Sequence, residues 1–212
     1  MEKINEIIKA LEKKYPNAKT ELEYDHKFPY QLVVAVMLSA QATDRGVNKA
    51  TPALFEKYKT PEDFANANFE ELTKYTKSIN FYNAKTKRII ENAKKLMELY
   101  NGKIPKTIKD LVKLPGIGRK SANVLLQEIY GIGEGVVVDT HMIRVGRRLG
   151  FHNFTKGSDA EKAEKVLNEI VPKNKYIIFS RGIVLTGRYI CKAKKPDCAN
   201  CILNKICPKI GI

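Results

Sequence analysis

The sequence predicts an all-α protein. Hydrophobic residues recur at helical spacing along most of the 212 residues. No segment alternates apolar and polar residues convincingly, and the valine run at 136–139 is too short to build a sheet. Packed amphipathic helices are therefore the expected architecture. The N-terminal segment shows the pattern with Ile4, Ile7, Ile8 and Leu11.

The first half of the chain predicts helices of different character. Residues 29–41 are apolar nearly all round and should form a central, buried helix. Residues 44–58 follow as a second helix, which Pro52 is expected to break or kink. Residues 83–100 carry one apolar face and predict a long amphipathic helix. Shorter helices are expected at residues 61–66 and 69–77.

The second half predicts a tight turn at Gly116–Gly118 and further helices after it. Asp139 or Thr140 should cap the helix that follows the valine run. Ser158 and Glu161 have the spacing of a capping box and should begin another helix. The helices expected in this half cover residues 107–113, 119–130, 139–149, 158–171 and 175–190.

The charge balance favours a polyanionic partner. Lysine and arginine number 38 against 23 acidic residues, which gives a net charge of +15. Nucleic acid is the simplest partner for such a surplus, and a solvated lysine-rich surface is the alternative. The N-terminus does not resemble a signal peptide, and the apolar run at 32–38 is too short to cross a bilayer. We expect a cytoplasmic protein.

The segment LPGIGRK, residues 114–120, predicts a phosphate site. Glycines let the main chain adopt positive φ and approach a ligand closely. The helix that begins there presents free N–H groups, which suit a DNA phosphate. Such a site holds the DNA backbone and has little sequence preference. The alternative is an ordinary turn between two helices.

Lys120 and Asp139 are candidates for chemistry. The dipole of a helix disfavours a cation at its N-terminus, and partial burial would act in the same direction, leaving some of the Lys120 amine neutral and nucleophilic. The alternative is a lysine that points to solvent or reaches a phosphate. Asp139 is first of all a capping residue, although the valines before it should bury it on one side. His141 is expected to pack or hydrogen-bond locally.

All four cysteines lie near the C-terminus, with the spacing Cys191-x6-Cys198-x2-Cys201-x5-Cys207. Four thiolates in one loop can hold a structural zinc ion or a [4Fe–4S] cluster, and their chemistry alone leaves the metal open. Lysines surround them, so the loop is a candidate contact for the DNA backbone. The alternative is a metal that only fastens the end of the chain.

Two further residues are open to more than one interpretation. Gln41, in the polar stretch SAQATD, either hydrogen-bonds a base edge or simply lies at a helix end. Phe81 is either an exposed wedge or a core aromatic, and composition alone favours the core.

Together these motifs resemble the endonuclease III family of DNA glycosylases. The resemblance extends along nearly the whole chain. It is carried by MLSAQATDRGVNKAT, INFYNAK, LPGIGRKSANVLL, VVVDTHMIRV, GRYIC and the cysteine spacing.

The resemblance implies a two-lobed helix-hairpin-helix DNA glycosylase fold with a C-terminal iron–sulfur cluster loop. Residues 22–132 would form a six-helix barrel domain, and residues 1–21 plus 133–212 a helical cluster domain. Cys191, Cys198, Cys201 and Cys207 fall on the ligands of a [4Fe–4S] cluster, with zinc as the alternative.

The resemblance also implies a function. The protein would be a monomeric, nucleoid-associated enzyme of base-excision repair that acts on double-stranded DNA with base damage. Lys120 matches the catalytic lysine, Asp139 the essential aspartate, and Gln41 the residue that fills the gap left by a flipped nucleotide. Phe81 stands where the family usually has leucine, and Asn80 replaces a glycine. The residues expected to contact DNA are Gln41, Phe81, Leu114, Gly116, Ile117, Gly118, Arg119, Lys192, Lys194 and Lys195.

The expected reaction is removal of oxidised or damaged pyrimidines by a glycosylase that is also an abasic-site lyase. It would proceed through a Schiff base on Lys120 and β-elimination. One alternative is a mismatch-specific monofunctional glycosylase, although such relatives generally lack the lysine. The other is a non-catalytic helix-hairpin-helix DNA-binding protein, which would not need both Lys120 and Asp139.

Overall fold

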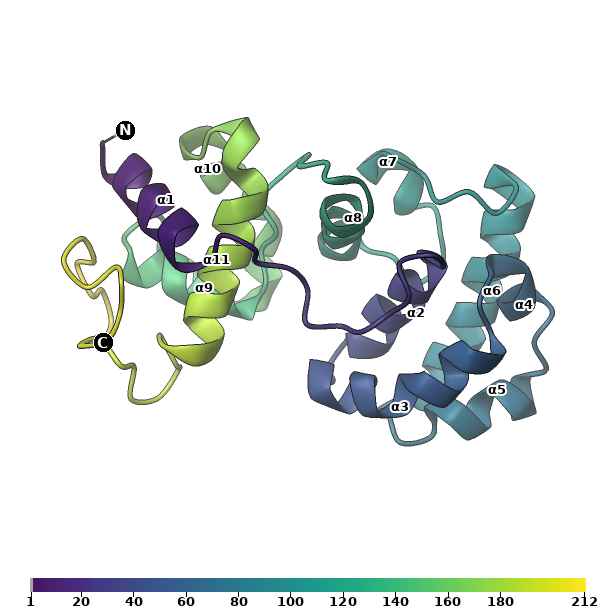
Figure 1. The fold of residues 1–212 in the computed structure, drawn as a ribbon. Coiled ribbons are helices and arrows are strands. Elements are labelled where there is room, and N and C mark those ends of the chain that lie inside the picture. The colour runs from purple at the N-terminus through teal and green to yellow at the C-terminus, as the bar shows by residue number, and fades with distance from the viewer. Residues whose placement is uncertain (1) are drawn as a thin grey trace. The chain divides into compact units, whose positions relative to one another are not determined.

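The computed structural model describes residues 2–212, and every regular element in that range is helical (Figure 1). The all-α prediction is confirmed. No helix in the described range is long and apolar enough to span a membrane. The helices are α1 (Glu2–Lys14), α2 (Tyr30–Ser39), α3 (Asp44–Lys57), α4 (Pro61–Ala65), α5 (Phe69–Thr76), α6 (Tyr82–Tyr100), α7 (Ile108–Leu111), α8 (Arg119–Leu125), α9 (Thr140–Arg148), α10 (Ala160–Ile170) and α11 (Tyr176–Tyr189), with a π-helical turn η1 (Leu126–Tyr130) and two 3₁₀ turns, η2 (Gly157–Asp159) and η3 (Lys173–Lys175).

The chain divides into two compact units. One, the hairpin unit, is Thr20–Tyr130. The other, the cysteine unit, joins Met1–Lys19 to Gly131–Ile212. The resemblance implied domains of 22–132 and of 1–21 plus 133–212, so the observed units begin and end slightly earlier in the chain.

Helix α2 is the centre of the hairpin unit, with α3, α6 and α8 packed against it. It is buried from Tyr30 to Leu38, as its apolar composition predicts. It ends at Ser39, earlier than expected from residues 29–41. The Lys85 ammonium of α6 donates hydrogen bonds of 2.7 Å to the Leu38 and Ala40 carbonyls. These bonds satisfy carbonyls that a longer helix would have used, and they place Gln41 outside α2.

Helix α3 runs from Asp44 to Lys57 without a break at Pro52. Of the predicted break or kink at Pro52, the break is therefore wrong. A proline inside a helix removes one main-chain hydrogen bond, but neighbouring side chains can hold the helix in place. Here Thr51, Leu54 and Phe55 are buried on either side of Pro52 and fix α3 to the core.

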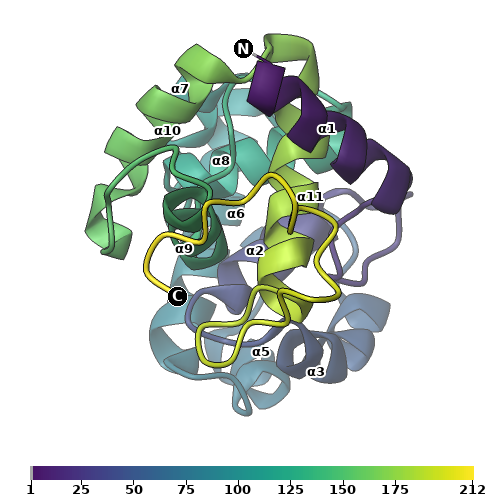
Figure 2. The same ribbon diagram turned by 90° about the vertical axis from the view of Figure 1, so that its left-hand side faces the viewer.

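Helices α1, α9 and α11 form the core of the cysteine unit. Helix α1 lies beside α11 in both views (Figures 1 and 2). Gly182 allows this approach, because a Cβ there would lie 2.9 Å from a methyl carbon of Leu11. The apolar face predicted for the N-terminal helix is confirmed. Its buried residues are Ile4, Ile7, Ile8 and Leu11.

Helix α10 begins differently from the prediction. It starts at Ala160 after the 3₁₀ turn η2, and Asp159 occupies the cap position without a side-chain capping bond. The capping box predicted for Ser158 and Glu161 is therefore wrong. The tighter turn takes Ser158 away from the cap position, and the Asp159 carboxylate pairs with Lys162 at 3.3 Å.

Candidate active site

The glycine turn, residues 114–120, joins α7 to α8 in the hairpin unit. Leu114 and Ile117 point into the core and are 2% and 5% exposed. The Asn92 amide of α6 donates a hydrogen bond of 2.8 Å to the Pro115 carbonyl. These buried side chains and this hydrogen bond hold the turn against the core. Leu114 and Ile117 can therefore offer only main-chain groups to a ligand. The exposed residues of the turn are Gly116, Gly118, Arg119 and Lys120.

The two glycines of this turn differ in backbone conformation and in the space around them. Gly116 has a φ of +81°, and a Cβ there would lie 2.7 Å from the Met37 Cε atom. Gly118 has an extended φ of −94°, and a Cβ there would meet nothing within 4 Å. The fold therefore requires glycine at Gly116 but not at Gly118. A bare main chain at Gly118 suits close approach by a ligand from outside.

Lys120 is the second residue of α8, and its side chain is exposed. It makes no hydrogen bond or ion pair with another described residue. The amine is thus open to a ligand that arrives at the glycine turn.

Asp139 is the N-cap of α9, in the cysteine unit. Its Oδ1 atom accepts a hydrogen bond of 2.8 Å from the Met142 N–H, so the capping role is confirmed. The extended segment before it is held by side chains, since Asn168 and Ser180 accept hydrogen bonds from the N–H groups of Val136 and Val137. Asp139 is half-buried, and its Oδ2 atom has no hydrogen-bond donor among the described residues.

His141, in the first turn of α9, makes a local contact. Its Nδ1 atom lies 3.1 Å from the Arg144 guanidinium, and its Cβ faces Gly187 of α11. The predicted local packing and hydrogen bonding are confirmed.

Gln41 and Phe81 lie together beside the glycine turn. Both have left-handed backbone conformations, with φ values of 55° and 59°. Phe81 is 65% exposed, so the core-aromatic interpretation is wrong. The Asn80 amide donates a hydrogen bond of 3.4 Å to the Gln41 carbonyl and joins the two loops. They share a pocket of about 270 Å³, the α2–α6 pocket, which is lined by Met37, Ala40, Gln41, Phe81, Ala84, Lys85, Arg88 and Gly116.

Sequence reasoning missed both charged residues of the α2–α6 pocket. Lys85 is buried, and burial lowers the pKa of its ammonium. Arg88 is exposed at the rim. Phe81 and Arg88 have a spacing in the sequence that would place both on one face of a helix. This spacing is the signal that could have predicted Arg88 as a residue of the same pocket.

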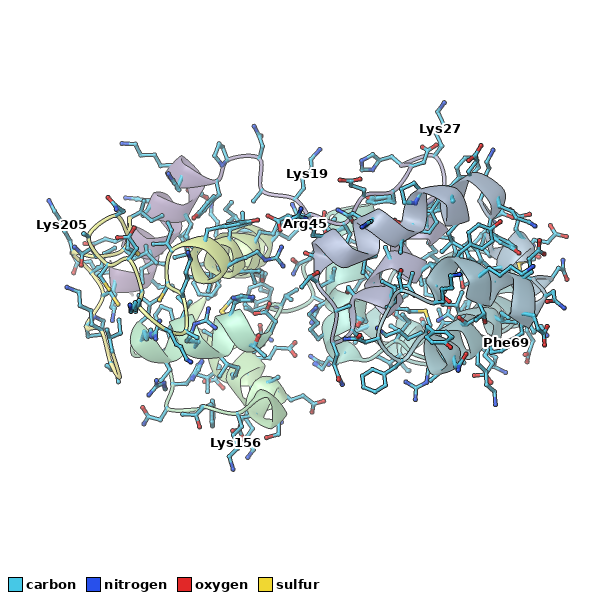
Figure 3. All side chains as sticks on the ribbon, turned by 90° about the horizontal axis from the view of Figure 1, so that it is seen from below. Lys19, Lys27, Arg45, Phe69, Lys156 and Lys205 are labelled. Carbon is cyan, nitrogen blue, oxygen red and sulfur yellow. The ribbon has the colours of Figure 1, made fainter. Side chains whose placement is uncertain are left out.

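The cysteine loop, residues 191–212, follows α11. The cysteines are free thiols and line one small pocket. Burial raises the pKa of the Cys201 thiol, and the three neighbouring cysteines add to this effect. No three His, Cys, Asp or Glu side chains between residues 2 and 212 are arranged to hold a single metal ion. Lys192, Lys194 and Lys195 are exposed. Figure 3 shows the side chain of Lys205 extending outward from the same loop.

Arg148 of α9 organises the start of this loop, a role that no sequence pattern predicted. Its guanidinium is buried and donates hydrogen bonds to the carbonyls of Cys191, Lys192 and Ala193, at 3.3, 2.7 and 3.1 Å. It also lies 3.2 Å from the Cys191 Sγ atom.

Comparison with known proteins decides the family. Residues 34–173 match the model of the HhH-GPD superfamily, described as base excision DNA repair proteins. Endonuclease III of Rickettsia felis is 44% identical over 96% of this chain and 93% of its own length. The chain belongs to the endonuclease III family. Endonuclease III of Bacillus subtilis is 45% identical over 91% of this chain and 86% of its own.

A solved endonuclease III, in a non-covalent complex with DNA, has the same fold. It superposes with a TM-score of 0.88 at 39% identity, covering 98% of this chain and 95% of that one. A second structure of similar likeness is a trapped covalent endonuclease III–DNA intermediate, described as an estranged-adenine complex. A thermostable thymine-DNA glycosylase shares the fold at 24% identity, with a TM-score of 0.81.

Proposed function

We propose that this endonuclease III removes oxidised or damaged pyrimidines from duplex DNA, with Lys120 as its nucleophile. It is a base-excision repair enzyme, a DNA glycosylase with abasic-site lyase activity. The observation that carries the proposal is the glycine turn. An exposed lysine stands next to a main chain that the fold leaves bare at Gly118.

The glycine turn would hold a DNA phosphate. Gly116, Gly118 and Arg119 are exposed there, while the buried side chains of Leu114 and Ile117 hold the turn against the core. A second contact with the DNA backbone would come from Lys192, Lys194 and Lys195 of the cysteine loop. Both contacts are to phosphates and favour no particular base sequence.

Excision begins when the damaged nucleotide leaves the helix, at a cost of a few kcal/mol that a lesion reduces. Gln41 would fill the gap, and Phe81 would act as the wedge. The Lys120 amine donates its lone pair to C1′ of the deoxyribose and forms a bond there. The bond between C1′ and the base breaks, and the base leaves with the electron pair of that broken bond. Asp139, through its unpaired Oδ2 atom, would stabilise the positive charge on the sugar and take part in moving the lysine proton.

Strand cleavage follows from the same covalent bond. The sugar ring opens to an imine between Lys120 and C1′, which acidifies the hydrogens on C2′. Loss of a C2′ proton forms a carbon–carbon double bond and expels the 3′ phosphate. Hydrolysis of the imine then returns the free lysine.

The four cysteines would hold a [4Fe–4S] cluster, with zinc as the alternative. The cysteine loop fits such a group, because four free thiols line one pocket and a buried guanidinium faces one of them. The cluster supplies structure, by joining distant parts of the loop. The working location would be the nucleoid in the cytoplasm, and the active form a monomer with the two domains implied by the resemblance.

Borohydride trapping tests this function. A duplex with thymine glycol is incubated with wild type, Lys120→Ala and the control Lys109→Ala, which removes an exposed lysine of α7. Wild type and the control should give a covalent protein–DNA band, and Lys120→Ala should give none. Base release without a band would indicate a monofunctional glycosylase. Binding without any reaction, on this duplex or an abasic one, would leave a non-catalytic DNA-binding protein.

A further inference from the structure

A groove of the hairpin unit lies between the start of α2 and the second half of α3, and the proposed chemistry does not use it. Residues from 23–31 and 51–59 line this α2–α3 groove, which has a volume of about 510 Å³. The volume falls within the ~300–1,000 Å³ typical of ligand pockets. The groove is therefore large enough to receive a ligand.

The α2–α3 groove lies away from the residues expected to contact DNA in this unit. Gln41 follows the C-terminal end of α2, and Gly116 approaches Met37 near that same end. The groove is at the other end of α2, where Phe28 and Gln31 line it. The ten residues of α2 separate its two ends by about 15 Å, at a rise of about 1.5 Å per residue. A molecule in the groove would therefore leave the glycine turn open to DNA.

Hydrogen bonds between side chains and main chain hold the two walls of the groove together. The buried side chain of Gln31 accepts a hydrogen bond of 3.0 Å from the Asp25 N–H and donates one of 3.1 Å to the Phe55 carbonyl. The Asn48 side chain of α3 accepts a hydrogen bond of 3.0 Å from the Glu23 N–H. The groove is thus formed before a ligand arrives, and binding would require little further ordering of the protein.

Apolar rings line much of the groove. They belong to Tyr24, Phe28, Pro52 and Phe55. Pro52 is exposed, although it interrupts the hydrogen bonding of α3, so the core does not require its ring. Aromatic residues are enriched in protein–protein interfaces, where they supply apolar area at the centre of the contact. The rings of the groove therefore suit an apolar side chain.

The charge of the groove is opposite to that of the chain as a whole. Three exposed carboxylates line it, and none forms an ion pair with another residue in the range 2–212. These carboxylates are Glu23, Asp25 and Glu56. Lys59 is the one cation among the lining residues, and its ammonium lies 5.9 Å from the centroid of the Phe28 ring. Lys27 extends outward (Figure 3) and does not line the groove. A negative groove on a chain of net charge +15 repels DNA and attracts cationic groups.

We propose that the α2–α3 groove is a docking surface for a basic segment of another protein, which inserts an apolar side chain between lysines or arginines. The apolar side chain would lie against Phe28 and Pro52, and the flanking cations would pair with Glu23 and Glu56. Such charge complementarity selects the partner and speeds its encounter with the groove. A small inorganic cation would leave the rings uncovered. Because the groove is remote from the glycine turn, the partner would bind the enzyme while the enzyme is on DNA.

A peptide titration tests the docking surface. The probe is the pentapeptide KKFKK, blocked at both ends, and the NMR amide signals of the full chain report its binding. Signals of residues 23–31 and 51–59 should shift, and those of the glycine turn should not. The peptide KKSKK should bind about tenfold more weakly, because it has the same charge but no ring to bury.

Charge-reversal variants locate the contact. Glu23→Lys/Glu56→Lys should weaken the binding of KKFKK by about tenfold or more. The matched control is Glu62→Lys/Glu70→Lys, which makes the same change of charge at exposed positions of α4 and α5 outside the groove and should keep the affinity of wild type. Thermal unfolding checks that both variants are folded. The two variants should excise thymine glycol at the same rate, since none of the four positions belongs to the proposed active site.

Three outcomes would overturn the proposal. The first is an absence of shifts at residues 23–31 and 51–59 when KKFKK is added. The second is equal affinity for KKFKK and KKSKK, because the groove would then sense only charge. The third is spermidine binding at the same residues as tightly as KKFKK, which would assign the groove to small polycations. Peptide binding is measured without DNA, so its result does not depend on whether the enzyme excises a base.

Discussion

The glycine turn and the cysteine loop are both basic and exposed, but they are held in different ways. The turn is supported by two buried side chains and by a hydrogen bond from Asn92. Within the cysteine loop, only Cys191 and Leu203 are buried. The loop depends instead on the Arg148 guanidinium and on whatever its thiols bind. A basic, exposed segment can thus be held either by apolar burial or by polar contacts and the ligands of its thiols, and the two segments should lose their structure under different conditions.

The largest difference should follow loss of the cysteine ligands. In Cys198→Ser, the cysteine loop should lose nearly all protection from amide hydrogen exchange, a fall on the order of several kcal/mol in opening free energy. The glycine turn should keep its protection, because no cysteine supports it. Iron content and hydrogen exchange measure both effects. Ala199→Ser is the control, since it changes the adjacent exposed residue. Equal protection of the loop in both variants would show that the thiols do not hold it.

A smaller loss is expected for Arg148→Met. The substitution leaves the carbonyls of Lys192 and Ala193 without their charged donor, while the Cys191 carbonyl keeps the Arg144 guanidinium, so the free energy of unfolding should fall by about 3 kcal/mol. Urea unfolding measures the change. Arg147→Met is the comparison, because its guanidinium makes no hydrogen bond with a described residue. A similar loss of unfolding free energy in both variants would show that the hydrogen bonds of Arg148 do not stabilise the loop.

Two glycine substitutions test the turn. Gly116→Ala should destabilise the protein by about 1–3 kcal/mol, because of the positive φ and the contact with Met37. Gly118→Ala should leave stability nearly unchanged yet weaken DNA binding, since its Cβ would meet only an incoming phosphate. Thermal unfolding and titration with an abasic-analogue duplex separate the two. Unchanged DNA affinity in Gly118→Ala would contradict a main-chain phosphate contact.

The smallest effect concerns His152, packed over Gly146 of α9. Burial lowers the pKa of His152, and Arg147 lowers it further. As the pH falls, His152 is therefore protonated at a higher pH in the unfolded chain than in the folded protein. The stability that His152 contributes above about pH 6.5 is lost as the pH falls toward its lower pKa in the folded state. Urea midpoints at pH 7.5 and 5 should differ less in His152→Leu than in wild type. An identical difference in the two proteins would show that another group causes the acid sensitivity.

The periodicity of hydrophobic residues predicted the helices because the residues that decide each helix lie within one or two of its turns. The buried face of α1 and the capping role of Asp139 follow from neighbouring residues. The early end of α2 does not, since it depends on Lys85, far along the chain. The α2–α6 pocket likewise joins three segments that lie apart in the sequence. Long-range contacts of this kind leave no local pattern, and so the role of Arg148 was not predicted.

The left-handed conformations of Gln41 and Phe81 bear on how such an enzyme searches a chromosome. Their cost is met once, when the chain folds, and not again at each step along the DNA. If Gln41 and Phe81 act as the gap filler and the wedge, they would test every base pair with the same rigid shape. The outcome of each test would then depend on how firmly that pair is stacked, and a pair weakened by damage would open first. The time spent at intact sequence would be set by the double helix and not by motions of the protein.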